Sequence, residues 1–151
     1  MKKSARKKVI IVDDNASYLS VVRILLKPHY EVYPAPSASK LFKIIEKFIP
    51  DLILLDINMP VMNGFEAISK LKENPRYKNI PVIFVTAKDD EDSAAIGLDL
   101  GAADYVTKPF SGPLLLKRIS NVLLIEQLKR DLQESIFTTT QLKEQLEYME
   151  E

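Results

Sequence analysis

Short apolar runs alternate along the chain with segments in which apolar residues recur every three or four positions. An unbroken apolar run is typical of a strand buried on both faces, and the spaced pattern is typical of a helix that buries one face. The predicted strands are residues 9–12, 30–33, 52–55, 81–85 and 105–107. The predicted helices are residues 15–27, 38–49, 64–74 and 89–100, with a last helix that starts around residues 111–113. Residues 34–36 contain two prolines and are expected to form a loop.

The alternation of five strands with five helices predicts a doubly wound α/β domain, because right-handed crossovers place such strands in a parallel sheet. The chain has 151 residues, of which 46% are hydrophobic and 28% charged, and this suits one domain with a substantial core. The carboxyl ends of parallel strands share one edge, where ligands gather. Residues at the strand ends are therefore the candidates for function.

Composition and charge exclude several kinds of function. The net charge is zero, so no overall field directs the protein to nucleic acid or a membrane. The absence of cysteine excludes disulfides and thiolate chemistry, and a single histidine, His29, disfavours histidine metal sites and Ser-His catalysis. Residues 1–8 form a basic arm without the apolar stretch of a signal peptide, and no segment is apolar enough to span a bilayer. A cytoplasmic location is expected.

Acidic residues follow two of the predicted strands. Asp13 and Asp14 come directly after the first strand, and Asp56 ends the apolar run of the third. Three carboxylates at one sheet edge repel each other and require a cation. Because the ligands are oxygens and neither cysteine nor histidine lies nearby, Mg²⁺ is the expected ion.

Two further strand ends carry residues suited to a phosphoryl group. Thr86 offers a hydroxyl donor and Lys108 a positive charge, and a carboxylate between them could be a nucleophile that forms an acyl phosphate. Each residue alone has a simpler interpretation, since an aspartate can cap a helix, a threonine can end a strand and a lysine can be solvated. Their shared position at successive strand ends favours a joint site.

Four motifs occur in a fixed order between residues 9 and 124. They are Asp13-Asp14 after a valine, Leu-Leu-Asp-Ile-Asn-Met-Pro-Val-Met-Asn-Gly from Leu54 to Gly64, Val85-Thr86-Ala87, and Gly-Ala-Ala-Asp-Tyr-Val-Thr-Lys-Pro-Phe from Gly101 to Phe110. Together they resemble the receiver domain of two-component response regulators, including the single-domain chemotaxis regulator. The resemblance implies a flavodoxin-like, five-stranded parallel sheet of order 2-1-3-4-5 with an extended C-terminal helix.

The resemblance also implies a role for each acidic residue. Asp56 would be the phosphoacceptor and Asp14 a direct Mg²⁺ ligand, with Asp13 acting mostly through water. The backbone carbonyl of Asn58 would complete the protein's share of the metal shell. The side chains of Asn58 and Lys88 lie at positions that vary among receivers and tune the lifetime of the phosphate.

Further implications concern the switch. Lys108 would bind a phosphoryl oxygen and precede a cis peptide bond to Pro109, and Thr86 would move toward the phosphate. Tyr105 matches the aromatic switch position, although it could equally be a partly buried strand tyrosine. A histidine kinase, a phosphotransfer protein or a small phosphodonor would supply the phosphoryl group. Phosphorylation would then switch the face formed by the fourth helix, fifth strand and fifth helix.

One enzyme class shares this strand-end arrangement of aspartate, threonine and lysine. Phosphatases that resemble haloacid dehalogenases place a second acid two positions after the nucleophilic aspartate of the first strand. Here Asp13 and Asp14 are adjacent and the chain has no cap insertion, so this alternative is remote. Chemistry limited to self-phosphorylation and self-dephosphorylation is expected.

The tail, residues 125–151, continues the last helix without proline or glycine. Apolar residues follow a heptad seam that Ser135 and Thr139 interrupt, and they are Ile125, Leu128, Leu132, Leu142, Leu146 and Met149. A continuous helix would be about 55 Å long. We expect a parallel two-stranded coiled coil that joins two receivers, the alternatives being a helix that folds back or frays.

The sequence of the tail does not identify the output domain or partner that receives the signal. It could begin a linker to a missing cyclase, phosphatase or kinase domain, and the chain would then be the regulatory input of a larger enzyme. No helix-turn-helix follows the receiver and the charges of the tail are mixed, so direct nucleic-acid binding is not expected.

Overall fold

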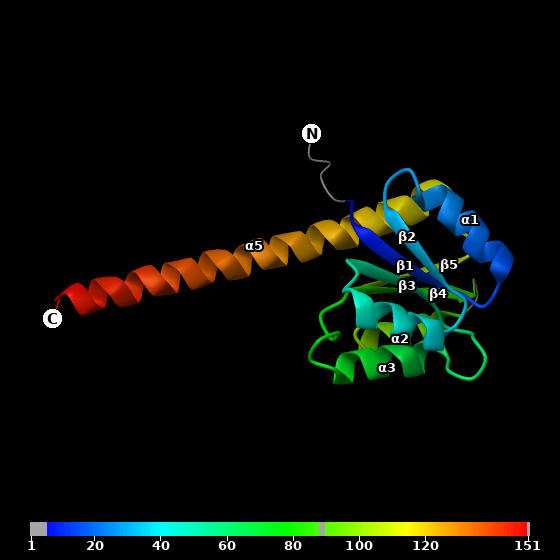
Figure 1. The fold of residues 1–151 in the computed structure, drawn as a ribbon, viewed down its shortest axis with the longest axis horizontal. Helices are drawn as coiled ribbons and strands as arrows, with labels where there is room; N and C mark the ends of the chain where they lie inside the picture. Colours follow the sequence, from blue (N-terminus) through cyan, green and yellow to red (C-terminus); the bar gives the residue numbers. More distant parts are fainter. Residues whose placement is uncertain (1–5, 88–89, 151) are drawn as a thin grey trace.

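A computed structural model describes residues 6–87 and 90–150. Five strands alternate with five helices, as the hydrophobic pattern predicts (Figure 1). The strands are β1 Lys8–Val12, β2 Glu31–Ala35, β3 Leu52–Asp56, β4 Val82–Ala87 and β5 Asp104–Lys108. The helices are α1 Ala16–Leu26, α2 Ala38–Lys47, α3 Gly64–Glu73, α4 Glu91–Asp99 and α5 Gly112–Glu150. Most of the basic arm and Lys88 lie outside the described residues.

The five strands form one parallel sheet in the order β2-β1-β3-β4-β5. This order confirms the doubly wound, flavodoxin-like fold. The central strand β3 is buried along its whole length. Its last residue, Asp56, pairs with Val85 of β4, and Leu55 pairs with Val12 of β1. The residues that follow β1 are thereby placed beside the end of β3.

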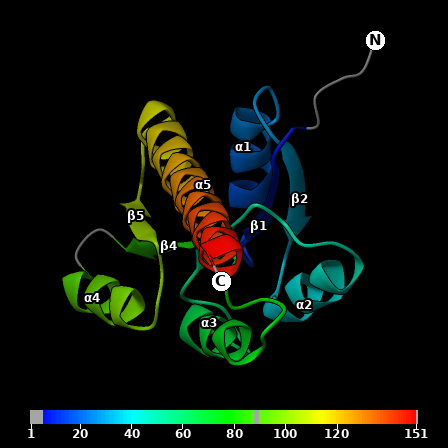
Figure 2. The ribbon, with the colours of Figure 1, turned by 90° about the vertical axis from the view of Figure 1, so that its left-hand side faces the viewer.

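Helices cover both faces of the sheet (Figure 2). Alternate residues of each strand point to opposite faces, so Ile10 and Val12 join the core beneath α2 and α3, whereas Val9 and Ile11 join the core beneath α1 and α5. Leu41 and Ile68 close the first core, which also contains Phe84. The second core is closed by residues of α1 and α5, namely Val22, Leu26, Leu115, Ile119 and Val122.

Side chains that accept hydrogen bonds from the backbone begin all five helices, including Asp90 at α4 and Ser111 at α5. Asn15 caps α1 and Ser37 caps α2. Asn63 and Glu66 form a reciprocal capping box at the start of α3. Gly101 has a φ of 105° and ends α4, because glycine adopts this conformation without steric cost. These caps fix where each helix begins relative to the strand before it.

The prediction of a loop at residues 34–36 is wrong in part, because β2 continues through Pro34 to Ala35. Proline lacks an N–H and is tolerated on an edge strand, and β2 is the edge strand that pairs only with β1 in the sheet order. Strands β4 and β5 are also longer than predicted. Thr86 and Lys108 therefore lie within strands rather than after them.

The last helix is one continuous element of 39 residues. Only its first part packs on the sheet, and the rest projects beyond the body of the domain (Figure 1). Its buried residues are Leu115, Ile119 and Val122, whereas the seam residues from Ile125 to Met149 are more than half exposed. Within the described residues the tail neither folds back nor breaks. Among residues 6–87 and 90–150, no helix is long and apolar enough to cross a membrane.

Candidate functional site

Three carboxylates meet at the carboxyl edge of the sheet. Asp13 and Asp14 follow β1, Asp56 ends β3, and one oxygen from each lies within 4.8 Å of the others. Asp13 and Asp56 are buried, with only 8% and 6% of their surface exposed, whereas Asp14 is exposed. The sheet order brings them together, because β1 and β3 are neighbours. The structure thus unites the three acids that the sequence placed at strand ends.

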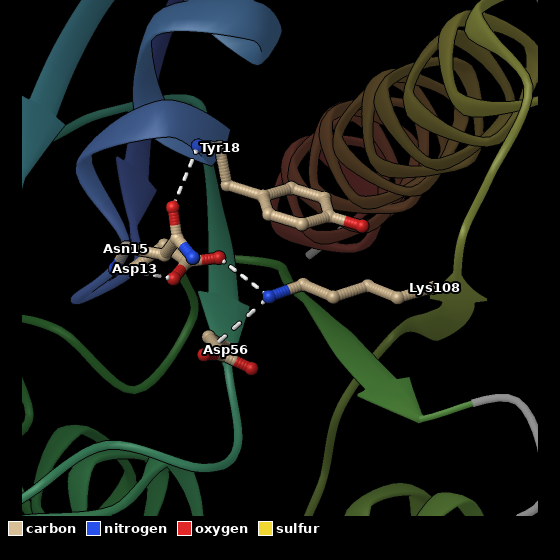
Figure 3. A network of polar contacts seen from close by, with 5 residues as sticks. All are labelled: Asp13, Asn15, Tyr18, Asp56 and Lys108. Carbon is tan, nitrogen blue, oxygen red and sulfur yellow. Dashed lines mark hydrogen bonds and ion pairs between the residues drawn. The ribbon is translucent and has the colours of Figure 1, made fainter.

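Lys108 reaches this cluster from β5, across β4 (Figure 3). Its Nζ donates a hydrogen bond to Oδ2 of Asp13 at 2.8 Å and lies 3.7 Å from Oδ2 of Asp56. Three carboxylates and one ammonium leave two negative charges uncompensated. A set of oxygen ligands with excess negative charge fits a hard divalent cation such as Mg²⁺.

Burial and charge change the pKa values of both central residues. Burial raises the pKa of Asp56 to about 6, and the neighbouring charge of Asp13 adds to the rise, although Lys108 and the backbone N–H of Asn58 act against it. For Lys108, burial lowers the pKa, but the hydrogen bond to Asp13 and the charge of Asp56 outweigh it, so its pKa is raised. Lys108 therefore remains an ammonium, and Asp56 is an unusually basic carboxylate.

The hydrogen bonds of Asp13 distinguish it from the other two acids. Its Oδ1 accepts the backbone N–H of Asn15 at 2.9 Å, and its Oδ2 accepts Lys108. Both oxygens thus already have a donor. Asp14 and Asp56 have fewer hydrogen-bond donors than Asp13. Asn58, two positions after Asp56, is exposed. This difference favours Asp14 and Asp56 for direct metal contact.

Thr86 and Tyr105 lie near the site without joining its polar network. The Thr86 side chain is buried, and its hydroxyl donates to the carbonyl of Ala87 at 3.2 Å rather than to a site carboxylate. Tyr105 is partly buried and pairs with Phe84 in the sheet register. The cis peptide between Lys108 and Pro109 is present as expected.

A glycine brings the loop after β3 back against the end of that strand. The N–H of Gly64 donates to the carbonyl of Ile57 at 2.8 Å. A Cβ atom at Gly64 would lie 2.6 Å from the backbone oxygen of Asp56, which is far too close. Because α3 starts at this glycine, the helix can lie directly beneath the site.

Tyr18 is the site residue that sequence reasoning missed. In the sequence it is one of the residues at helical spacing in the predicted helix of residues 15–27, yet the Nζ of Lys108 lies 4.1 Å from the centre of its ring. The available signal was its position in the first turn after the two acids, combined with an aromatic ring where an aliphatic residue would satisfy the helical pattern.

Comparison with known proteins identifies the family. Residues 9–120 match the profile of the response regulator receiver domain, and the chain belongs to this family. It is 39% identical over 118 residues to the phosphate regulon transcriptional regulatory protein PhoB of Pseudomonas aeruginosa, covering 78% of this chain and 52% of PhoB. It is 33% identical over 128 residues to the response regulator PleD of Caulobacter vibrioides, covering 82% of this chain and 28% of PleD.

Solved structures agree with this assignment. The chemotaxis protein CheY4 of Vibrio cholerae superposes with a TM-score of 0.73 at 33% identity, covering 78% of this chain and 99% of CheY4. The curated relatives are longer proteins, because the matched region spans only 8% to 52% of their length. The chain is thus a receiver of two-component signalling, a class of phosphoacceptor domains that bind Mg²⁺ at an acidic pocket.

Proposed function

We propose that Asp56 accepts a phosphoryl group with the help of Mg²⁺ and that the phosphorylated domain acts as a switch. The observation that carries this proposal is the placement of Lys108 between Asp13 and Asp56, beside an otherwise uncompensated acidic cluster. Asp14 and Asp56 would hold the metal directly, Asp13 through water, and Asn58 through its backbone carbonyl. The bound ion would screen the carboxylates from the oxygens of the incoming phosphoryl group.

The chain's own residues would then carry the transfer. An oxygen of Asp56 forms a bond to phosphorus as the bond from phosphorus to the donor nitrogen of a phosphohistidine breaks, and the donor imidazole leaves. Lys108 moves from Asp13 to a phosphoryl oxygen and stabilises the charge in the transition state. Hydrolysis of the acyl phosphate by water resets the domain, so the chemistry is confined to the protein itself.

The signal would leave through Thr86 and Tyr105. When the Thr86 hydroxyl gives up the Ala87 carbonyl and turns to the phosphate, it vacates space beneath the sheet edge, and the Tyr105 ring turns inward. This change would alter the face formed by α4, β5 and α5. Asp104 of β5 and Arg118 of α5 form an ion pair of 3.3 Å on that face, which links the two elements.

The direct test is phosphorylation of the purified chain by acetyl phosphate or phosphoramidate with Mg²⁺. Intact-protein mass spectrometry should detect a single added phosphoryl group that requires Mg²⁺. The Asp56→Asn variant keeps the shape of the side chain and should remain unmodified. Phosphorylation of Asp56→Asn to the wild-type extent would reject Asp56 as the acceptor.

We further propose that two copies of the chain pair through a parallel coiled coil of α5. The seam residues Ile125, Leu128 and Leu132 are 51%, 58% and 61% exposed, and Leu142, Leu146 and Met149 continue the same heptad spacing. A second copy supplies a matching apolar seam of equal length, which a globular partner does not.

The polar interruption of the seam does not prevent this pairing. The Thr139 hydroxyl donates to the carbonyl of Ser135 at 2.8 Å, and the Thr140 hydroxyl donates to that of Ile136 at 2.9 Å. Because each hydroxyl is satisfied within its own helix, burying Thr139 leaves no unpaired donor. The middle of the coiled coil is weak rather than broken.

Light scattering on the full chain and on a version ending at Leu124 tests the pairing. We expect a dimer that tightens with Mg²⁺ and beryllofluoride, an analogue of the phosphoryl group, and that is lost with the tail. A monomeric full chain at all concentrations would reject the coiled coil while leaving the phosphoacceptor role intact.

A second possibility is that the receiver regulates a larger output protein. The matched region is 28% of PleD and 52% of PhoB, so receivers of this kind occur within longer chains. A cyclase, phosphatase or kinase output would then receive the signal through α5, and a cytoplasmic histidine kinase or phosphotransfer protein would supply the phosphoryl group. Whether the reading frame continues beyond residue 151 distinguishes the two cases.

A further inference from the structure

An aromatic ring lies against the ammonium of Lys108. The centre of the Tyr18 ring is 4.1 Å from Nζ of Lys108, and the ring projects over the site from the start of α1 (Figure 3). A cation over an aromatic face at this distance is attracted by the electron density of the ring. Lys108 therefore has three partners, which are Asp13, Asp56 and the ring of Tyr18.

The ring is held from two directions. The backbone N–H of Tyr18 donates to the Asn15 side chain at 3.1 Å, which ties the residue to the cap of α1 and to the loop that carries Asp13. Phe110 meets the ring in an edge-to-face contact, with ring centres 6.1 Å apart and an angle of 63° between the planes. Because Phe110 lies two residues after Lys108, the lysine and its aromatic partner are fixed by the same segment.

We propose that Tyr18 is a positioning residue that holds the ammonium of Lys108 between Asp13 and Asp56. A lysine side chain has a flexible four-carbon stem, so a point charge at its end is poorly located without such a support. The ring leaves the ammonium free to move from Asp13 to a phosphoryl oxygen while keeping it over the site. This inference rests on the proposed phosphorylation of Asp56.

The competing explanation is that Tyr18 only packs α1 against the domain. The two explanations differ in what replaces the ring. Phenylalanine keeps the aromatic face and should preserve the contact, whereas leucine fills apolar space without attracting a cation. The Tyr18→Phe and Tyr18→Leu variants therefore form a matched pair.

The experiment measures the affinity of the full-length variants for Mg²⁺ alone and for beryllofluoride in saturating Mg²⁺. We expect Tyr18→Leu to weaken beryllofluoride binding by about tenfold, since a partly desolvated cation–π contact has roughly this effect. The affinity for Mg²⁺ alone should be unchanged, and Tyr18→Phe should bind both as the wild type does. Equal beryllofluoride affinity in all three proteins would overturn the proposal. So would a parallel loss of Mg²⁺ affinity in Tyr18→Leu, because it would show that Tyr18 acts on the acidic loop.

A second measurement does not depend on phosphoryl chemistry. The methylene protons beside Nζ of Lys108 lie near the ring and should show an upfield ring-current shift in the NMR spectrum of the unliganded protein. The shift should persist in Tyr18→Phe and disappear in Tyr18→Leu. If the wild type binds no beryllofluoride, the phosphoacceptor proposal fails, but the ring-current shift still shows whether Tyr18 holds Lys108. Absence of the ring-current shift from the wild type would overturn the contact between Tyr18 and Lys108.

Discussion

The Nζ of Lys108 donates a 2.8 Å hydrogen bond to Asp13, a residue 95 positions earlier in the chain. Both side chains are mostly buried, with 23% of the side-chain surface of Lys108 and 11% of that of Asp13 exposed. The opposite charges of Lys108 and Asp13 therefore compensate each other in a region where water screens charges poorly. In this arrangement the lysine is bound to an acid of the carboxylate cluster, and in the proposed reaction it leaves that acid to reach a phosphoryl group on Asp56.

Removal of this ammonium should destabilise the metal-free protein. Lys108→Met keeps the length of the side chain but leaves the carboxylates of Asp13 and Asp56 without a counter-charge. We expect the free energy of unfolding at neutral pH without Mg²⁺ to fall by about 1–3 kcal/mol. Added Mg²⁺ should restore more stability to this variant than to the wild type, as measured by urea titration.

The matched control is Lys117→Met, because Lys117 is an exposed lysine of α5. Its free energy of unfolding should change by less than about 0.5 kcal/mol. If the two lysine variants lose equal stability, the ammonium of Lys108 does not compensate the cluster.

Magnesium binding should depend on pH through Asp56, whose pKa is about 6. Below this value the carboxyl group is mostly protonated, and a metal must displace the proton. The affinity for Mg²⁺ should therefore rise about tenfold between pH 5 and pH 7 and then level off. Isothermal titration calorimetry at several pH values measures this. Asp56→Asn should bind more weakly and show a flatter profile, and identical profiles would assign the titration to another group.

The same pKa predicts the sign of the stability change without metal. The pKa of Asp56 is raised from 3.8 to about 6 in the folded protein, so the folded state binds more protons than the unfolded state between these values. The contribution of Asp56 to stability is therefore full below pH 3.8 and is lost as pH rises through 6. Asp56→Asn should remove this decline, as urea titrations between pH 5 and 7 would show. A decline of equal slope in Asp56→Asn would contradict the assignment.

Gly64 should be intolerant of a side chain. A Cβ there would meet the backbone oxygen of Asp56 at 2.6 Å and Cα of Ile57 at 2.8 Å, and neither backbone atom can move without shifting Asp56. We expect Gly64→Ala to lower the free energy of unfolding by about 2–4 kcal/mol and to weaken beryllofluoride binding. Chemical denaturation and ligand titration measure the two effects.

Gly112 provides the control for that substitution. A Cβ at Gly112 would meet the end of the Leu25 side chain at 2.9 Å, and a flexible side chain can move aside. Gly112→Ala should therefore cost less than Gly64→Ala and leave ligand binding unchanged. If the two alanine variants lose equal free energy of unfolding, the close approach of Gly64 to Asp56 does not explain the loss.

The pattern of apolar residues was sufficient for the fold because the three central strands, β1, β3 and β4, are buried on both faces. The runs at residues 9–12 and 52–55 have no polar alternation, and such runs occur in few architectures other than a parallel sheet between helices. The meeting of Asp13 with Asp56 then followed from topology, since strand ends share an edge. The cis bond before Pro109 came from the family resemblance alone.

Two features lay beyond the sequence for physical reasons. Pro34 marks a loop in most contexts, and only the position of β2 at the sheet edge makes it compatible with a strand. Tyr18 satisfies the helical apolar pattern, so the pattern could not reveal that its ring faces a cation from β5. Both depend on contacts between elements that are distant in sequence.

Replacement of the polar seam residue Thr139 should tighten the proposed dimer. Thr139 occupies the same heptad position as Ile125 and Leu132. β-branched apolar residues at this position favour parallel dimers. Thr139→Ile should therefore lower the dimer dissociation constant at least about tenfold. Thr140→Ile is the matched control, because its hydroxyl makes the same bond to its own helix but the residue lies beside the seam. Sedimentation equilibrium should detect tighter association in the first variant only. Equal effects, or none in either, would mean that the exposed apolar residues of α5 do not pair along this seam.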